Sequence, residues 1–139
     1  MLSGQLDILF KVVNIAGLII GLFSILVGGF GIANIMFVSV KERTNIIGIQ
    51  KSLGAKNYFI LLQFLIEAIV LCLMGGLIGL TMVYLGTFVV KWAWSVTIVL
   101  YLKNIIIGIS TSVAIGVIAG IVPAYFASRL DPVEAIRSN

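Results

Sequence analysis

Residues 12–40 read VVNIAGLIIGLFSILVGGFGIANIMFVSV, a stretch of 29 residues without one charged side chain. A helix that crosses the hydrocarbon core of a bilayer needs about 20 such residues. Further along the chain, residues 57–90 are interrupted only by Glu67, and residues 104–128 carry no charge. The 139-residue chain is 61% apolar and 10% charged, whereas soluble domains are roughly 25% charged. The sequence therefore predicts an all-α membrane protein with three transmembrane helices.

We expect a single membrane domain over residues 1–139. Its spans cover about residues 12–40, 59–90 and 104–128, with a loop at 41–56 and a tail at 129–139. The apolar stretch 92–102 is too short to cross a bilayer. An interfacial loop or a short strand is expected there.

The side chains that most catalytic and metal sites require are scarce. The chain has no His, one Cys and five acidic residues, so the usual metal ligands and the Ser-His-Asp and Cys-His arrangements cannot be assembled. No G-x-x-x-x-G-K-[ST] phosphate loop occurs. The nine Lys and Arg residues are scattered, with no run suited to nucleic acid. We expect a chain that is not an enzyme by itself, binds no metal or cofactor and has no nucleic-acid partner.

The distribution of basic residues predicts the orientation in the membrane, because cytoplasmic loops carry an excess of Lys and Arg. Loop 41–56 and the tail hold six of them, and the opposite side holds three. The loop and the C-terminus are therefore expected in the cytoplasm. The N-terminus then lies outside, behind eleven residues with no export signal. Either a short tail crosses unaided, or a helix in front of it belongs to a longer protein.

Small residues recur along each predicted span and predict close helix packing, since membrane helices associate over small side chains that let their backbones approach. The pattern leaves open whether the partner helix lies in the same chain or in a second protomer. The packing glycines are Gly17, Gly21, Gly28, Gly75, Gly79, Gly108, Gly116 and Gly120.

Glu67 is the one ionisable residue inside an apolar block. A carboxylate at mid-membrane is a candidate proton or cation site. However, the block is longer than one span requires, and a crossing segment of about 20 residues that ends near Val90 begins near Leu71. This placement puts Glu67 at the inner interface, which is the interpretation we favour.

Residues 41–56, KERTNIIGIQKSLGAK, are the most informative stretch for function. Ile46, Ile49 and Leu53 form an apolar stripe at helical spacing, with Thr44 as the expected N-cap and Gly54 as the expected residue after the C-cap. Such a short amphipathic helix either lies on the membrane surface or inserts its stripe into a groove of a partner. The residues alone slightly favour the membrane surface.

Several motifs in this loop and beyond it carry a family resemblance. They are ERT at 42–44, IGI at 47–49, Lys51, LGA at 53–55, QFLIEA at 63–68, PA at 123–124 and LDPVEAIR at 130–137. Together they resemble the FtsX-like permease family, most closely its MacB-type ABC transporters. The chain departs from that pattern at Asn45-Ile46 and Gln50, where the family commonly has charged residues, and at Tyr125-Phe126.

The resemblance implies the membrane part of an ABC permease, in which loop 41–56 is a coupling helix that contacts a nucleotide-binding domain. That partner binds ATP and Mg²⁺, and its closure drives export or extraction of a substrate by mechanotransmission. The residues implied in the contact are Glu42, Arg43, Ile46, Ile47, Gly48, Ile49, Lys51, Leu53 and Gly54.

The resemblance also implies a bacterial inner-membrane location, a homodimer or a paired permease, and a periplasmic adaptor as a further partner. Family members have four membrane helices, with an extracytoplasmic domain after the first. This chain would then lack that first helix and that domain.

Two other functions remain open at this point. One is a non-transporting scaffold or regulator, like the family's cell-division branch that controls wall hydrolases. The other is a small ion- or proton-coupled transporter that uses Glu67.

Overall fold

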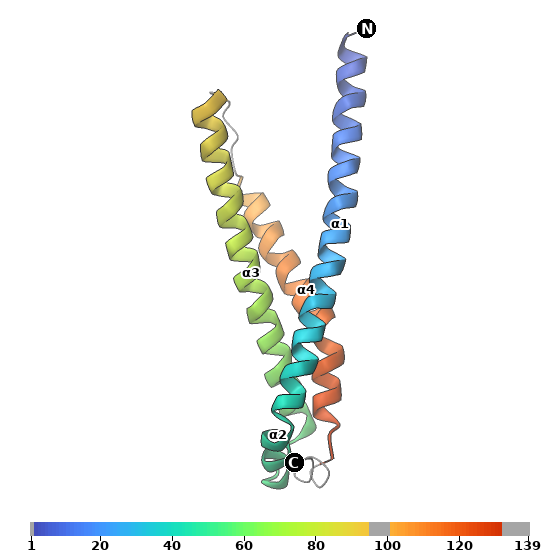
Figure 1. The fold of residues 1–139 in the computed structure, drawn as a ribbon, viewed down its shortest axis with the longest axis vertical. Helices are drawn as coiled ribbons and strands as arrows, with labels where there is room; N and C mark the ends of the chain where they lie inside the picture. Colours follow the sequence, from blue (N-terminus) through green and yellow to red (C-terminus); the bar gives the residue numbers. More distant parts are fainter. Residues whose placement is uncertain (1, 95–100, 132–139) are drawn as a thin grey trace.

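The computed structural model describes residues 2–94 and 101–131 of the chain. Four helices make up almost all of this part: α1 (Leu2–Glu42), α2 (Thr44–Ser52), α3 (Asn57–Trp94) and α4 (Leu102–Ser128). Three of them, α1, α3 and α4, are long and apolar enough to cross a membrane, while α2 is a short connection between α1 and α3 (Figure 1). The prediction of an all-α protein with three transmembrane helices is confirmed.

The long helices extend beyond the predicted apolar spans. α1 begins at Leu2 rather than near residue 12, and α3 continues to Trp94. The expected loop or strand at 92–102 is therefore wrong at both ends, since residues 92–94 belong to α3 and Leu102 begins α4. Residues 95–100 lie outside the described part. The physical reason is that an established helix gains one hydrogen bond with each added residue, and no Gly or Pro interrupts residues 87–94.

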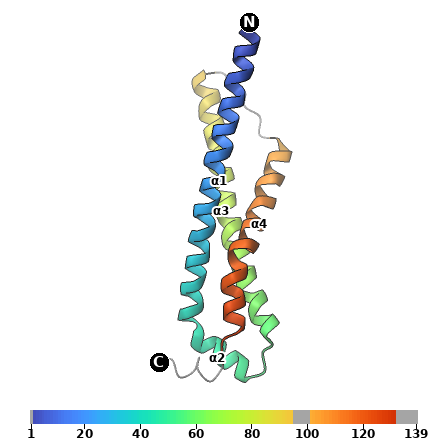
Figure 2. The same ribbon diagram turned by 90° about the vertical axis from the view of Figure 1, so that its right-hand side faces the viewer.

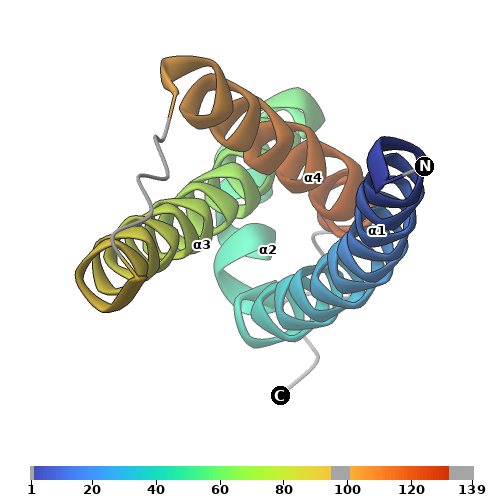
Figure 3. The ribbon, with the colours of Figure 1, turned by 90° about the horizontal axis from the view of Figure 1, so that it is seen from above.

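The three long helices are packed together at the end that carries α2 and diverge toward the other end (Figures 1 and 2). Seen from above, α4 lies between α3 and α1 along one side of the bundle (Figure 3). Most interhelical contacts join α3 to α4, fewer join α1 to α4, and α1 scarcely meets α3. The N-terminal half of α1 projects with its side chains exposed.

The core of the described residues gathers at the α2 end. It draws on all four helices, so α2 is part of the packed structure and not an appendage. Its members are Met36, Val40, Ile47, Ile60, Phe64, Ala68, Ala124 and Ala127.

The predicted packing glycines fall into two groups. On α4, a Cβ added at Gly116 would meet the Ile69 Cα at 2.8 Å, and one at Gly120 would meet the Ala68 Cβ at 2.5 Å. Gly108 faces the Leu80 side chain more loosely. Around Gly17, Gly21, Gly28, Gly75 and Gly79, a Cβ would meet no atom of the described chain within 4 Å. Of the predicted packing glycines, those of α4 therefore line the α3–α4 seam, and those of α1 and α3 face open space within the described chain.

Candidate functional site

The short helix α2 lies across the lower end of the bundle (Figures 1 and 2). It ends at Leu53, and Gly54 follows with a φ of 97°. The Gly54 N–H donates to the Lys51 carbonyl at 3.0 Å, and the Ala55 N–H donates to the Gln50 carbonyl at 2.9 Å. These two bonds form a Schellman motif, and they confirm Gly54 as the residue that follows the C-cap.

The expected N-cap of α2 is wrong. Arg43 occupies that position and makes no capping bond with its side chain, while Thr44 is the first residue of the helix. The Thr44 hydroxyl turns the other way and lies 3.0 Å from the Val40 carbonyl and 2.8 Å from the Lys41 carbonyl. The reason is that α1 runs on to Glu42, so carbonyls in its last turn lack intrahelical partners. Thr44 therefore stabilises the end of α1 and not the start of α2.

Two opposite faces of α2 have different surroundings. Ile47, only 2% exposed, belongs to the core, and Gly48 beside it is also buried. The predicted stripe lies on the other side: Ile46 is 55%, Ile49 48% and Leu53 83% exposed. Since successive residues of a helix are about 100° apart, the stripe points away from the bundle. The helix thus has one apolar face in the core and a second apolar face that is exposed.

Lys51 points toward the bundle. Its Nζ donates to the carbonyl oxygens of Ser128, the last residue of α4, and of Leu130 just beyond it, each at 2.7 Å. Loss of hydration lowers the pKa of the Lys51 ammonium group, and the Asp131 carboxylate opposes this effect. The resemblance implies that Lys51 contacts an ATPase. In the structure, its side chain extends from α2 to the end of α4.

Arg43 forms an ion pair with Glu67 of α3. The Arg43 Nη2 lies 3.3 Å from Oε1 of Glu67, and Nη1 donates to Oε2 at the same distance. The two guanidinium nitrogens therefore face the two carboxylate oxygens. A carboxylate that pairs with a residue of the connecting loop lies near the α2 end of α3, in agreement with the interfacial interpretation of Glu67.

The predicted contact residues are therefore divided between roles. Four of them are exposed, namely Glu42, Ile46, Ile49 and Leu53. Three are directed into the bundle, namely Ile47, Gly48 and Lys51. Arg43 is paired, and Gly54 makes the turn. Sequence reasoning missed the carbonyl acceptors of Lys51, which lie 77 and 79 residues further along the chain. The sequence did contain a signal for the Arg43–Glu67 pair, because the basic loop 41–56 and the acidic Glu67 are both expected at the inner membrane interface. Residues 132–139 of the expected tail lie outside the described residues.

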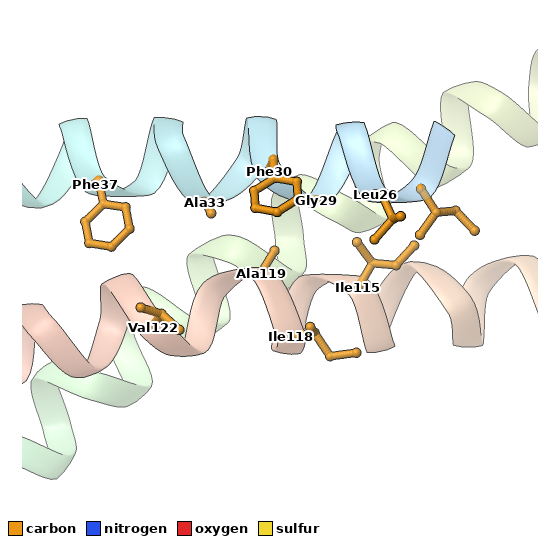
Figure 4. A pocket seen from close by; sticks show the side chains of 10 residues that line it. Leu26, Gly29, Phe30, Ala33, Phe37, Ile115, Ile118, Ala119 and Val122 are labelled. Carbon is orange, nitrogen blue, oxygen red and sulfur yellow. The ribbon is translucent and has the colours of Figure 1, made fainter. Parts of the chain in front are cut away.

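An apolar hollow lies between α1 and α4 and has a volume of about 470 Å³. Figure 4 shows Phe30, Ala33 and Phe37 of α1 facing Ala119 and Val122 of α4. All of its lining residues are aliphatic, aromatic or glycine. Among residues 2–94 and 101–131, no three His, Cys, Asp or Glu side chains lie together as a metal site would require.

Comparison with known proteins places this geometry in context. Residues 18–132 match the family described as FtsX-like permease C-terminal. The chain is 48% identical over 124 residues to YknZ of Bacillus subtilis, named an uncharacterized ABC transporter permease. This match covers 89% of this chain and 31% of YknZ.

Two longer proteins are also similar. The chain is 44% identical over 123 residues to SyfD of Pseudomonas syringae pv. tomato, a probable syringafactin export ATP-binding/permease protein, covering 85% of this chain and 18% of SyfD. It is 44% identical over 118 residues to the macrolide export ATP-binding/permease protein MacB of Shewanella oneidensis, covering 84% of this chain and 18% of MacB. The chain thus spans less than a third of the length of these relatives.

Proposed function

Since this chain belongs to the FtsX-like permease family, we propose that it is the membrane part of an ABC transporter that couples ATP hydrolysis to export or extraction of a substrate. The family membership and the three long apolar helices make it a multi-pass membrane permease. The proposal adds the coupling step. In it, α2 receives a displacement from an ATP-binding partner, and the long helices carry that displacement across the membrane by mechanotransmission.

The observation that carries this proposal is the exposed apolar stripe of Ile46, Ile49 and Leu53 on α2. A helix that rests on the membrane surface buries its apolar face toward the lipid. Here the face of α2 toward the bundle is already taken up by Ile47 and Gly48, and the stripe is on the opposite side. An apolar stripe that faces away from the membrane bundle suits a groove on a protein partner better than it suits lipid.

The partner and the location follow from the same proposal. Relatives named ATP-binding/permease proteins combine both parts in one chain, which supports an ATP-binding subunit or domain as the partner. ATP and Mg²⁺ would bind there, and the catalytic residues for hydrolysis would belong to it. We place the protein in the bacterial inner membrane, as a homodimer or paired permease with a periplasmic adaptor as a further partner. The Lys and Arg distribution supports a cytoplasmic position for α2 and the C-terminus.

A photo-crosslink from position 49 tests this proposal. A photoreactive amino acid replaces Ile49 in the full-length protein in native membranes, and mass spectrometry identifies what is captured. Matched probes replace Ile47, which is buried, and Leu6, which is exposed at the other end of the bundle. We expect an ATP-binding subunit or domain from position 49 and from neither control. Capture of lipid alone from position 49 would contradict the coupling role and favour the non-transporting scaffold.

A further inference from the structure

The carbonyl groups at the end of α4 form a link between α4 and α2 that is separate from the proposed contact with an ATP-binding partner. The last four carbonyls of a helix have no intrahelical partner and must be satisfied by other groups. In α4, the Ser128 hydroxyl donates to the Tyr125 carbonyl at 2.7 Å. The N–H groups of Arg129 and Leu130 donate to the carbonyls of Phe126 and Ala127. The fourth carbonyl, that of Ser128, accepts from Lys51.

Lys51 is therefore a C-terminal cap for α4 that is supplied by another helix. Its two bonds are short at 2.7 Å, as is usual when the donor is charged. A cation at a helix C-terminus also interacts favourably with the helix dipole. Ser128 is 2% exposed, so one of these bonds joins a buried carbonyl, and its loss would leave that acceptor without its charged donor.

Each long helix has its own link to the α2 region. Thr44 contacts the last turn of α1, Arg43 pairs with Glu67 of α3, and Lys51 bonds to the end of α4. The Arg43–Glu67 pair is partly exposed to water, and such pairs are weak. The Lys51 link, with two charge-assisted bonds to backbone, is the stronger polar attachment.

We propose that Lys51 is a positioning residue that fixes the end of α4 to α2, so that a displacement of α2 moves α4 with it. The attachment of α4 to α2 by Lys51 is a feature of the fold and does not depend on the coupling role of α2. The transmission of a nucleotide-driven displacement rests on that proposed function. The two parts are therefore tested by separate measurements on the same variants.

The variants are Lys51→Met, Lys51→Arg and Lys56→Met. Methionine keeps the unbranched apolar chain and removes the donor, whereas the arginine guanidinium still donates in several directions. Lys56 is an exposed lysine just beyond α2, so Lys56→Met controls for the loss of one positive charge. All are made in the full-length protein assembled with its ATP-binding partner, with Cys72 and every other native cysteine of the assembly replaced by Ala so that only introduced cysteines carry spin labels.

The first measurement is the nucleotide-free distance distribution between spin labels at Ser52 on α2 and Ile121 on α4, by double electron–electron resonance. We expect a narrow distribution in the parent protein, Lys51→Arg and Lys56→Met, and one at least twice as wide in Lys51→Met. A distribution in Lys51→Met as narrow as in the parent would overturn the proposed link.

The second measurement places labels at Val89 on α3 and Lys103 on α4, both exposed at the far end of the bundle, and adds ATP, Mg²⁺ and vanadate. We expect a change in this distance in the parent protein and in Lys51→Arg. In Lys51→Met we expect less than half of that change, with the ATPase rate within about twofold of the parent and with crosslinking from position 49 retained.

The outcomes separate the two proposals. A full nucleotide-driven change in Lys51→Met would refute transmission through this residue. If Lys51→Met lost the crosslink from position 49 while Lys56→Met kept it, Lys51 would be a contact to the partner and the positioning role would be refuted. If the distance between Val89 and Lys103 did not change with nucleotide in the parent protein, the proposed coupling function would be refuted. The width of the distance distribution between Ser52 and Ile121 would still test the link through Lys51.

Discussion

At the scale of single residues, the α2 region depends on a few side chains and one backbone angle. Gly54 adopts a φ of 97°, a conformation that costs an L-residue roughly 1–2 kcal/mol. This turn reverses the chain between α2 and α3, so it fixes the angle at which α2 lies under the bundle. Gly54 therefore shapes the candidate contact surface through the backbone and not through a contact of its own.

Gly54→Ala is expected to destabilise the protein by about 1–2 kcal/mol, because alanine disfavours the left-handed conformation. Gly54→Asn is expected to cost less, since asparagine tolerates that region better. Equilibrium unfolding in mixed micelles measures both changes. Equal stability of the alanine variant and the parent would show that the turn does not require glycine.

Glu67→Gln tests the proton-site interpretation. The Arg43–Glu67 pair is partly exposed, and pairs of this kind contribute about 0–1 kcal/mol. We expect a small loss of stability and an ATPase rate, in the assembled transporter, that keeps its pH dependence. Loss of activity in Glu67→Gln together with normal activity in Ile49→Asp would instead support ion or proton coupling through Glu67.

At the scale of helices, the α3–α4 seam and the two faces of α2 decide the architecture. Close approach of α4 to α3 depends on Gly116 and Gly120, because an added Cβ at either position would overlap Ile69 or Ala68. In a bilayer, where lipid is as apolar as the side chains, such close packing is a main source of helix association.

Gly120→Ala is expected to destabilise the protein by about 1–3 kcal/mol, the usual cost of overpacking. Gly79→Ala is the matched control on α3, because its new Cβ would meet nothing within 4 Å. Helix propensity favours alanine over glycine by about 1 kcal/mol, so the control should be neutral or stabilising. Thermal unfolding of the two variants in the same detergent makes the comparison. A stable Gly120→Ala variant would mean that the seam can relax.

Ile49→Asp tests the exposed face of α2. Ile49 is about half exposed, so we expect the fold to persist. A carboxylate in an apolar groove is unfavourable, and binding of the ATP-binding partner should weaken at least tenfold, with hydrolysis no longer coupled. Ile47→Asp is the contrasting variant, since burial of its charge in the core should unfold the base of the bundle. Normal partner binding by a folded Ile49→Asp protein would exclude this stripe as the contact.

At the scale of the whole molecule, α1 has a glycine face that no other part of the described chain covers. An ATPase whose nucleotide sites form between two domains would require two permease halves, and Gly17, Gly21 and Gly28 have open space around them. In the homodimer proposed above, this face is the one that substitution of its glycines tests. It lies well away from the face of α1 that meets α4 around Gly29 and Ala33.

Gly17→Leu is therefore expected to lower the dimer fraction severalfold, because a large side chain prevents the close approach of two helices. Ala16→Leu is the matched control on the neighbouring position of the same exposed helix. Crosslinking yield in native membranes measures both. An unchanged dimer fraction in Gly17→Leu would move the contact elsewhere.

Much of the architecture was predictable from sequence because long uncharged blocks have few solutions in a membrane. The three spans follow from block length, and Gly54 follows from helix-ending rules. Features that depend on tertiary proximity were not predictable. Nothing in the sequence around Lys51 indicates that it bonds to a carbonyl 77 residues away. Thr44 contacts the end of α1 because that helix continues to Glu42, beyond the uncharged stretch 12–40. Gly76, outside the predicted set, packs against Ser112, since stripe position alone does not tell which face meets a neighbour.

The length of α1 has a mechanical consequence. With 41 residues, it is roughly 60 Å long, about twice the thickness of the hydrocarbon core. It is held mainly at its lower end, around Met36 and Val40. A rigid rod pivoting at one end acts as a lever, and a tilt of about 5° would swing the far tip of a ~60 Å helix through ~5 Å. The length of this helix thus amplifies motion, because a small rotation at its base becomes a displacement of several ångströms at its tip.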